Sequence, residues 1–277
     1  MEQIDYLVIG HVSRDITPTG WLVGGTAAYS GRTAQALGCR TAVLTSTAFD
    51  YEGIHQLPGL TVSQVSAEVT TTFENVYTPG GRQQTIHAIA ERLTAEHLPA
   101  GWERAKVVQL APIANEVAPE MIYLFSNSIV GLTPQGWLRR WDENGRVYAA
   151  EWPAAPAILP LAAAVILSQE DLLDDAMLEQ YRQWSKLLVL TQGARGCTIF
   201  NGDDVRRIPA FPVEEVEPTG AGDIFAAAFL LRLYQTAGNP WEAARFANYV
   251  AAQSVTQVGL AAKIQKVQSE VEKYTAT

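Results

Sequence analysis

One short segment in the last third of the chain joins glycines to an acidic side chain just before an apolar run. Residues Pro218–Asp223 read PTGAGD and lead into IFAAAFLLRL. Two glycines allow a tight turn, and the free N–H groups in the first turn of a helix then attract an anion. Asp223 fits two interpretations here: an acidic residue that favours the helix macrodipole, or a general base beside an anion site. The apolar run predicts a buried helix, which favours the second interpretation.

Two further glycine segments follow apolar runs. Gly24 and Gly25 precede an alanine-rich stretch, and Asp15 lies upstream of them in a loop after the first apolar run. Loops at strand ends hold ligands in open α/β sheets, so Asp15 and the glycine backbone could bind hydroxyl groups; the alternative is that Asp15 is a solvated turn residue. Gln192–Gly196, which reads QGARG, is either a ligand loop or a simple turn.

The elements that must position these segments alternate along the chain. Predicted strands span 4–10, 41–46, 107–110, 129–132, 165–167 and 187–191, and predicted helices span 26–37, 117–125 and 171–184. Apolar runs of this length separated by helical patterns indicate βαβ units. We therefore expect a parallel sheet covered by helices on both faces.

Two regions depart from that alternation. Residues 60–88 alternate apolar and polar side chains, which is typical of half-exposed antiparallel strands in a small separate sheet. Near the C-terminus, a hairpin signal over 197–208 precedes predicted helices at 221–236, 240–258 and 264–274. No linker separates two autonomous parts, so the prediction is a single domain over residues 1–277.

Composition excludes several classes of protein. The 277 residues are 48% hydrophobic, and 29 acidic against 20 basic residues leave a net charge of −9, which argues against a nucleic-acid partner. The longest stretch without a strongly polar residue, 152–167, is 16 residues long and contains three prolines, short of the roughly 20 that a membrane span needs. With two distant cysteines, Cys39 and Cys197, and no basic stretch before an apolar core at its start, the chain is predicted to be cytoplasmic.

Several signatures of other enzymes are missing. No lysine follows a glycine, which excludes a GxxxxGK loop, and the first strand leads into GHVSRD instead of GxGxxG. The four histidines show no paired metal-ligand spacing, and no GxSxG elbow occurs. These absences leave the glycine segments as the main candidates for a site.

Three motifs then occur in a recognisable order. VIGHVSRD with Gly24-Gly25 and AQALG is similar to an N-terminal signature, LTQGARGCTIF to a strand, nucleotide loop and strand, and PTGAGDIFAAAFLLRL to a C-terminal signature usually written DTGAGD. A weaker match is FANYVAAQSVTQVG, similar to a helix along an adenine pocket. Together the motifs resemble the ribokinase-like (PfkB) carbohydrate kinases over almost the whole chain.

The resemblance implies a fold and an activity. The fold would be a three-layer α/β/α arrangement with a mostly parallel central sheet and a small β lid, formed by about 60–88 and part of 16–23. The activity would be transfer of the ATP γ-phosphoryl group, with Mg²⁺, to a hydroxyl of a small sugar, an inositol-like polyol or a nucleoside. The alternative is a binding or regulatory protein that kept the fold but lost turnover, and two copies could pair through the exposed lid.

The resemblance also implies roles for individual residues. Asp223 would take the proton of the attacking hydroxyl, and the N–H groups of Gly220, Ala221 and Gly222 would stabilise the transferring phosphoryl oxygens. Substrate would contact Asp15, Gly24, Gly25 and Tyr29; the nucleotide would contact Thr219, Gly193, Gly196 and Asn248; and the metal would be held by Asp171 or Glu170.

Three departures from the family pattern bear on those roles. Pro218 replaces the first aspartate of DTGAGD, and Ser168–Asp171 reads SQED where the family has NxxE. The alternative for SQED is a helix start with Ser168 as N-cap. Tyr29 replaces a substrate-binding asparagine, and a ring face in place of an amide favours a cyclic polyol or nucleoside over ribose or fructose. Alternatively, Tyr29 only packs beneath the lid.

Overall fold

A nine-stranded sheet organises the computed structural model, which describes residues 3–78 and 81–275. Its order is β15-β14-β13-β12-β9-β8-β1-β4-β5. The bounds are β1 Tyr6–Ile9, β4 Thr41–Ala48, β5 Thr61–Ala67, β8 Val107–Leu110, β9 Ile129–Leu132, β12 Ala164–Ser168, β13 Leu188–Thr191, β14 Cys197–Asn201 and β15 Asp204–Ile208. The strands from β13 to β5 run parallel, and β14 and β15 join β13 as an antiparallel hairpin. The predicted mostly parallel sheet is confirmed.

The central strands are short apolar runs because both of their faces are covered. In β1, Tyr6 and Val8 pack into one core, whereas Leu7 and Ile9 pack into another on the opposite face. A strand that alternates between two cores needs apolar residues at every position. The carboxyl ends of these parallel strands meet at one edge of the sheet, where ligands bind in open α/β folds.

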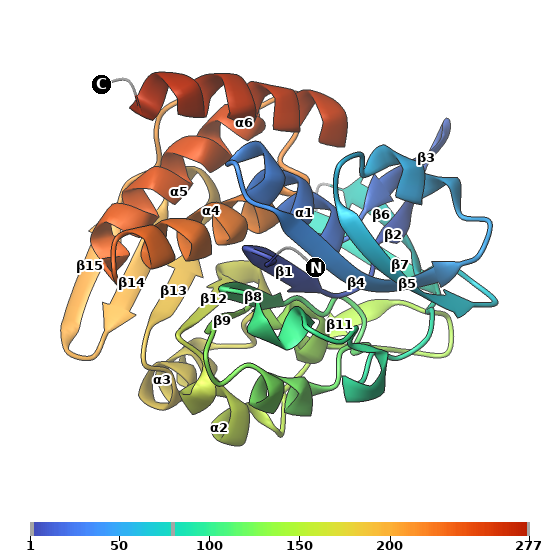
Figure 1. Ribbon diagram of the computed structural model, residues 1–277, viewed down its shortest axis with the longest axis horizontal. Coiled ribbons are helices and arrows are strands. Elements are labelled where there is room, and N and C mark those ends of the chain that lie inside the picture. The colour runs from blue at the N-terminus through green and yellow to red at the C-terminus, as the bar shows by residue number, and fades with distance from the viewer. Residues whose placement is uncertain (1–2, 79–80, 276–277) are drawn as a thin grey trace.

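The two faces carry different helical layers (Figure 1). One core lies under four long helices: α1 Thr26–Ala36, α4 Ala221–Gln235, α5 Pro240–Ser254 and α6 Leu260–Thr275. The other core lies under α2 Ala155–Ile158, α3 Asp175–Trp184 and short 3₁₀ turns, among them Trp102–Arg104, Pro119–Leu124, Pro134–Leu138 and Leu159–Leu161. The prediction of helices on both faces is confirmed, although the helix expected over 117–125 is a 3₁₀ turn. That turn spans Pro119–Leu124, with the proline at its first position.

A second sheet stands beside the first and covers its carboxyl edge. It contains β2 Ser13–Thr17, β3 Gly20–Gly24, β6 Thr72–Thr78 and β7 Gly81–Ala88, in the order β3-β2-β6-β7. Hereafter this sheet is called the lid sheet. A short third sheet pairs β10 Arg139–Trp141 with β11 Val147–Ala149. Pairing of two copies through the lid stays a prediction.

The lid expected over 60–88 is wrong for its first strand. β5 pairs in parallel with β4, from Ala42 opposite Thr61 to Ala48 opposite Ala67, and is therefore an edge of the main sheet. Its side chains alternate between exposed and half-buried because an edge strand is only partly covered. That alternation resembles the pattern of an antiparallel strand. The lid sheet also takes in more of the N-terminal hairpin than the expected 16–23, since β2 begins at Ser13.

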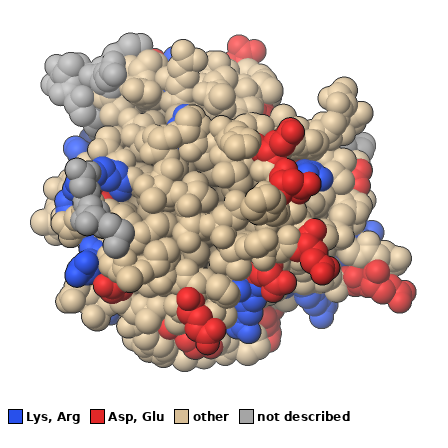
Figure 2. Space-filling view, turned by 45° about the vertical axis from the view of Figure 1, so that its right-hand side comes forward, with Lys and Arg blue, Asp and Glu red and all other residues tan. Residues whose placement is uncertain are grey.

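Charged side chains do not form a continuous basic surface on the face shown in Figure 2, where acidic and basic groups are scattered around a largely uncharged centre. This distribution agrees with the net charge of −9. Within residues 3–78 and 81–275, no helix combines the length and apolar character needed to cross a lipid bilayer.

Candidate active site

A cavity of about 620 Å³ lies at the carboxyl edge of the main sheet, next to the lid sheet. Its lid side, as we call it, is formed by Ser13, Asp15, Gly25, Tyr29, Phe73, Asn75 and Gln84. Its glycine side is formed by residues from 191–196, 210–222 and 248–255. Thr26, Ile113, Gln135, Arg139, Ser168, Glu170, Asp223 and Phe225 complete the lining. Of the predicted site residues, Gly24 and Asp171 are not among those that line it.

The floor of the cavity is the start of α4. Gly220 has a φ of 78° and caps the helix in the left-handed conformation, which glycine adopts without strain. The Ala221 N–H donates to the Pro218 carbonyl at 3.0 Å, so it is engaged within its own turn. In the described part of the chain, the N–H groups of Gly220 and Gly222 have no backbone partner of this kind. Two of the three predicted anion-binding donors are therefore available to the cavity.

Asp223 occupies the first turn of this helix. Its backbone carbonyl accepts a hydrogen bond from Ser30 Oγ at 3.0 Å, and its carboxylate accepts one from the Thr26 side chain, which ties α4 to the start of α1. Burial raises the pKa of Asp223 to about 6; the bond from Thr26 and the positive charge of Arg139 oppose this shift. A carboxyl group with such a pKa is mostly ionised at neutral pH and still accepts a proton readily.

Gly24 and Gly25 let the chain pass close to Asp15. A Cβ on Gly24 would lie 2.4 Å from the carboxylate of Asp15, and a Cβ on Gly25, whose φ is 88°, would lie 2.3 Å from the carbonyl oxygen of His11. Ser13 Oγ donates to Asp15 Oδ1 at 3.0 Å and orients the carboxylate. Gly24 thus makes room for Asp15, whereas Gly25 and Asp15 themselves line the cavity.

Tyr29 was expected either to present its ring to the substrate or only to pack beneath the lid, and the structure shows both exposure to the cavity and close packing. It lines the cavity, and it is also only 3% exposed because its ring packs against Gly220, where a Cβ would lie 2.3 Å from the ring. Burial raises the pKa of Tyr29 well above its ordinary value, and the negative charges of Glu217 and Asp15 add to the shift. The phenol is therefore neutral, and its ring supports the loop before α4.

The glycine side presents tight backbone and an apolar wall. A Cβ on Gly196, whose φ is 90°, would lie 2.2 Å from the Ile208 carbonyl oxygen, so no side chain fits there. Asn248 reaches the cavity, but its Nδ2 donates to the carbonyls of Ile208 and Pro209 at 3.1 and 3.3 Å. Apolar lining comes from Ala210, Phe211, Pro212, Val213, Ala251, Ala252 and Val255, and the predicted Gly193 and Thr219 also line this side.

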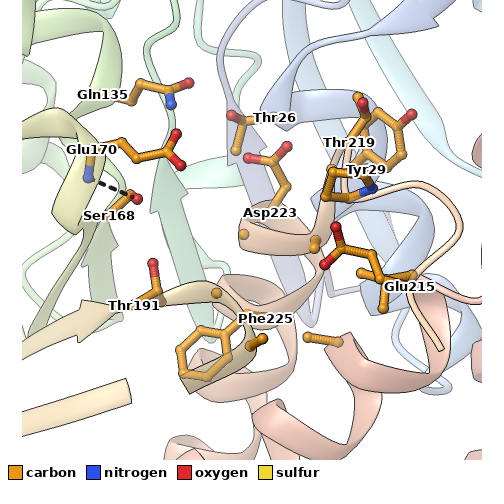
Figure 3. A pocket seen from close by; sticks show the side chains of 18 of the residues that line it. Thr26, Tyr29, Gln135, Ser168, Glu170, Thr191, Glu215, Thr219, Asp223 and Phe225 are labelled. Carbon is orange, nitrogen blue, oxygen red and sulfur yellow. Dashed lines mark hydrogen bonds between the residues drawn. The ribbon is translucent and has the colours of Figure 1, made fainter. Parts of the chain in front are cut away.

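The segment Ser168–Asp171 forms a cap. Ser168 Oγ accepts from the Glu170 N–H at 3.2 Å, while Asp171 Oδ2 accepts from the Ser168 N–H at 3.0 Å. Asp171 Oδ1 also accepts from Gln135 Nε2 at 3.3 Å. Each oxygen of Asp171 thus already accepts a hydrogen bond, and Asp171 is not among the residues that line the cavity, so its role as a metal ligand stays a prediction. Glu170 points into the cavity toward the space in front of Asp223 (Figure 3).

A magnesium ion brought in with a nucleotide fits this donor set. The described residues contain no cluster of three or more His, Cys, Asp or Glu side chains arranged for a metal. Mg²⁺ does not need such a cage, since it is commonly held by one or two carboxylates together with phosphate oxygens and water. Glu170, which faces Asp223 across the cavity, offers such a carboxylate.

Several lining residues escaped the sequence analysis, among them Phe73, Asn75, Gln84, Gln135 and Arg139. The first three belong to β6 and β7 of the lid sheet, and Gln84 Nε2 donates to Asn75 Oδ1 at 2.9 Å. The two-residue spacing of Phe73 and Asn75 puts both on one face of a strand, which is the signal that could have found them. Gln135 lies in the 3₁₀ turn after β9 and Arg139 begins β10, and the sequence around them shows no such pattern.

Comparisons with known proteins agree with this geometry. The model of the pfkB family of carbohydrate kinases matches residues 159–267. The cytidine kinase of Thermococcus kodakarensis is 27% identical over 257 residues, covering 82% of this chain and 87% of the relative. The inositol 3-kinase of Oryza sativa subsp. japonica is 27% identical over 293 residues, covering 94% and 70%.

Solved structures show the same fold. A pyrophosphate-dependent kinase of the ribokinase family superposes with a TM-score of 0.82 at 21% identity, covering 95% of this chain and 99% of the other. A putative ribokinase from E. coli in complex with ATP and Mg²⁺ gives a TM-score of 0.72 at 18% identity, with 98% and 99% coverage. The fold, the kinase relatives and the family match over the C-terminal motifs lead to one conclusion: residues 159–267 match a PfkB family carbohydrate kinase domain, within a chain that has the ribokinase-like fold.

Proposed function

We propose that this enzyme transfers the γ-phosphoryl group of ATP to a hydroxyl of a cyclic polyol or a nucleoside. The observation that carries the proposal is the position of Asp223, at the floor of one cavity that has polar side chains on its lid side and exposed backbone on its glycine side. A base in that position can reach an acceptor hydroxyl and a phosphoryl group at once.

Asp223 would act on the acceptor. Its carboxylate takes the proton of the attacking hydroxyl while the oxygen of that hydroxyl bonds to phosphorus and the bond from phosphorus to the leaving phosphate oxygen breaks. The hydrogen bond from Thr26 fixes the carboxylate in place. The lid sheet would exclude water, so that the activated phosphoryl group is not hydrolysed.

The start of α4 would act on the donor. The N–H groups of Gly220 and Gly222 and the positive end of the helix dipole meet the charge that spreads over the transferring phosphoryl oxygens. When bound, Mg²⁺ neutralises phosphate charge and fixes the phosphate chain. We assign its protein ligand to Glu170, because Glu170 lines the cavity whereas Asp171 does not and already accepts a hydrogen bond at each oxygen.

The glycine side supports a nucleotide as donor. Seven apolar residues between Ala210 and Val255 form a wall beside the phosphate end of the cavity, and such a wall suits the faces of a purine base. Inorganic pyrophosphate is the second candidate, because the fold is shared with a pyrophosphate-dependent kinase of the same family. Pyrophosphate would leave the apolar wall unused.

The lid side supports an acceptor with hydroxyls on one edge and an apolar ring face. Asp15, Asn75 and Gln84 offer hydrogen-bonding groups, whereas Phe73 and Tyr29 offer aromatic surface. Similarity to a cytidine kinase and to an inositol 3-kinase supports the same two classes of acceptor. An open-chain or small furanose sugar would leave the aromatic surface without a partner.

The test is a turnover panel read by mass spectrometry of the phosphorylated product. ATP and inorganic pyrophosphate, each with Mg²⁺, are combined with myo-inositol, cytidine, adenosine, ribose and fructose. We expect the fastest turnover with ATP and either myo-inositol or a nucleoside. Preference for ribose or fructose contradicts the acceptor class, turnover with pyrophosphate alone contradicts the donor, and no turnover with any pair supports the binding-protein alternative.

Two variants accompany the panel. In Asp223→Asn, loss of the base should lower kcat by about 10²–10⁴-fold with the donor KM changed only a few-fold. Asp175→Asn, which alters an exposed acidic residue in the first turn of α3, is the matched control and should keep the wild-type rate. Similar kcat values for wild type and Asp223→Asn would exclude Asp223 as the base.

A further inference from the structure

Lys263 is a lysine with no exposed side-chain surface, on the face of α6 that packs against the rest of the protein. Leu260, Ile264 and Val267 share that face and are also buried. In Figure 1, α6 lies across α1 and α5, far along the sequence from the motif at the start of α4. Buried lysines are rare unless their ammonium group is paired, so its partners indicate what it does.

The ammonium group of Lys263 binds the loop that leads into α4. Nζ donates to the carbonyl oxygen of Glu217 and, at 2.9 Å, to that of Thr219, and it lies 3.4 Å from Oε2 of Glu217. The same Oε2 accepts from the Gly259 N–H at 2.7 Å, just before α6 begins. One cation therefore clamps both sides of Pro218. Burial lowers the pKa of Lys263, and the charge of Glu217 opposes that shift.

This clamp fixes the direction of one peptide group in the site. In a planar trans peptide, the carbonyl and the N–H point to opposite sides of the chain. The Thr219 carbonyl points toward Lys263, so the N–H of Gly220 points away from it, on the side where Gly220 lines the cavity. Pro218 contributes no N–H and has a restricted φ, which removes competing arrangements of the loop.

We infer that Lys263 is a positioning residue for phosphoryl transfer: its buried ammonium group holds the Thr219–Gly220 peptide so that the Gly220 N–H faces the transferring phosphoryl group. The inference rests on the proposed function and extends it to a side chain that does not line the cavity. Lys263 acts through the backbone, and its effect should fall on the transition state, where charge on the phosphoryl oxygens is met by that N–H.

The test compares Lys263→Met, which keeps the length of the side chain but lacks the ammonium group, with Lys266→Met. Lys266 lies one turn further along α6, bridges to Glu270 at 3.0 Å and is 32% exposed. At a temperature well below both melting points, Lys263→Met should lower kcat at least about 10-fold, since loss of one oxyanion donor costs about 10²–10³-fold. The KM values should stay within about two-fold, and Lys266→Met should match wild type.

Chemical rescue separates positioning from simple loss of stability. In Lys263→Ala, methylammonium can enter the space left by the side chain and donate to the two carbonyls, whereas tetramethylammonium at the same ionic strength has no N–H. We expect methylammonium alone to restore part of kcat. If Lys263→Met does not fold, Lys263→Gln replaces it, because its amide keeps donors at reduced length and without charge.

The contradicting outcomes are distinct. Folded Lys263→Met with kcat within two-fold of wild type overturns the inference, and so does equal rescue by both cations or an effect confined to KM. The wild-type chain and Asp223→Asn are assayed alongside. Absence of turnover in wild type overturns the proposed function itself and the inference with it, whereas a normal Asp223→Asn defect beside an active Lys263→Met overturns only the role of Lys263.

Discussion

The two sides of the cavity are built in different ways. The groups of the glycine side that we propose to face the phosphate come from one contiguous junction, Pro218–Asp223, and are mainly backbone N–H groups. The lid side takes Asp15 from β2, Asn75 from β6 and Gln84 from β7, and uses side chains. A reaction fixed by backbone at one helix start can be read from a short motif. An acceptor wall drawn from three strands cannot.

The carboxylates around Asp223 connect the two sides of the cavity. Two further carboxylates line the cavity beside Asp223: Asp15 belongs to the lid side, and Glu170 faces Asp223 (Figure 3). Burial raises the pKa of Asp223, and Asp15 adds to the shift, so the lid side helps to set the base strength used at the glycine side. We therefore expect substitutions on the lid side to change the kinetics for the acceptor, and substitutions on the glycine side to change binding of the donor. Substitution of Asp223 should affect the reaction of both.

The largest separable effect is expected on the lid side. Asn75→Leu leaves Gln84 Nε2 without its 2.9 Å partner and removes a polar group facing the acceptor, so kcat/KM for the acceptor should fall about 10–100-fold, as expected for loss of about 1–3 kcal/mol. The donor KM should not change. Gln83→Leu, on the exposed face of β7, is the control. An equal rise in the donor KM would remove the distinction between the two sides.

A smaller effect is expected on the apolar wall of the glycine side. Phe211→Ala removes an aromatic ring that packs edge-on against Tyr249 at a centroid distance of 5.3 Å and lines the cavity. Aromatic stacking on a base contributes about 1–3 kcal/mol, so calorimetry should show ADP binding about 10-fold weaker, with acceptor KM unchanged. Val216→Ala, in the same loop and exposed, is the control. Unaltered ADP affinity would favour a phosphoryl donor that has no purine ring, such as pyrophosphate.

The smallest effect concerns the metal. Glu170→Gln should raise the Mg²⁺ concentration for half-maximal rate about 10-fold, because one of the few protein oxygens near the phosphates loses its charge. Asp171→Asn should leave that concentration unchanged and lower the melting temperature, since a helix cap of this kind contributes about 1 kcal/mol. If only Asp171→Asn raised the Mg²⁺ concentration for half-maximal rate, Asp171 and not Glu170 would be the metal ligand.

Much of the fold could be predicted because the central strands are buried on both faces. Residues 107–110 and 129–132 are strands with the expected bounds, and the apolar run after Asp223 is the buried helix α4. β5 was misplaced because an edge strand shows the alternation of a half-exposed antiparallel strand. The predicted helix over 117–125 is a 3₁₀ turn over Pro119–Leu124, and apolar residues spaced by three or four positions do not distinguish the two kinds of helix.

The candidate site could also be predicted only in part. Most glycines of the three motifs line the cavity, with Gly24 as an exception, because the tight backbone there needs glycine. The sequence could not separate the two interpretations of Asp171, because a capping carboxylate and a metal-binding carboxylate look alike in a sequence. Lys263 left a signal that was not used: it follows Leu260 by three residues and precedes Val267 by four, which puts it on the apolar face of its helix. Its partners, two backbone carbonyls, leave no trace in sequence.

The most direct test of the account is the pH dependence of kcat/KM for wild type and Asp223→Asn with the acceptor that the panel identifies. Because burial raises the pKa of Asp223 to about 6, the carboxyl is protonated below that pH and cannot accept the hydroxyl proton. Wild type should lose about tenfold in kcat/KM per pH unit below about 6 and reach a plateau above it, and the residual activity of Asp223→Asn should lack this limb. A flat wild-type profile down to about pH 4.5, or the same limb in Asp223→Asn, would contradict Asp223 as the base on which both sides of the cavity converge.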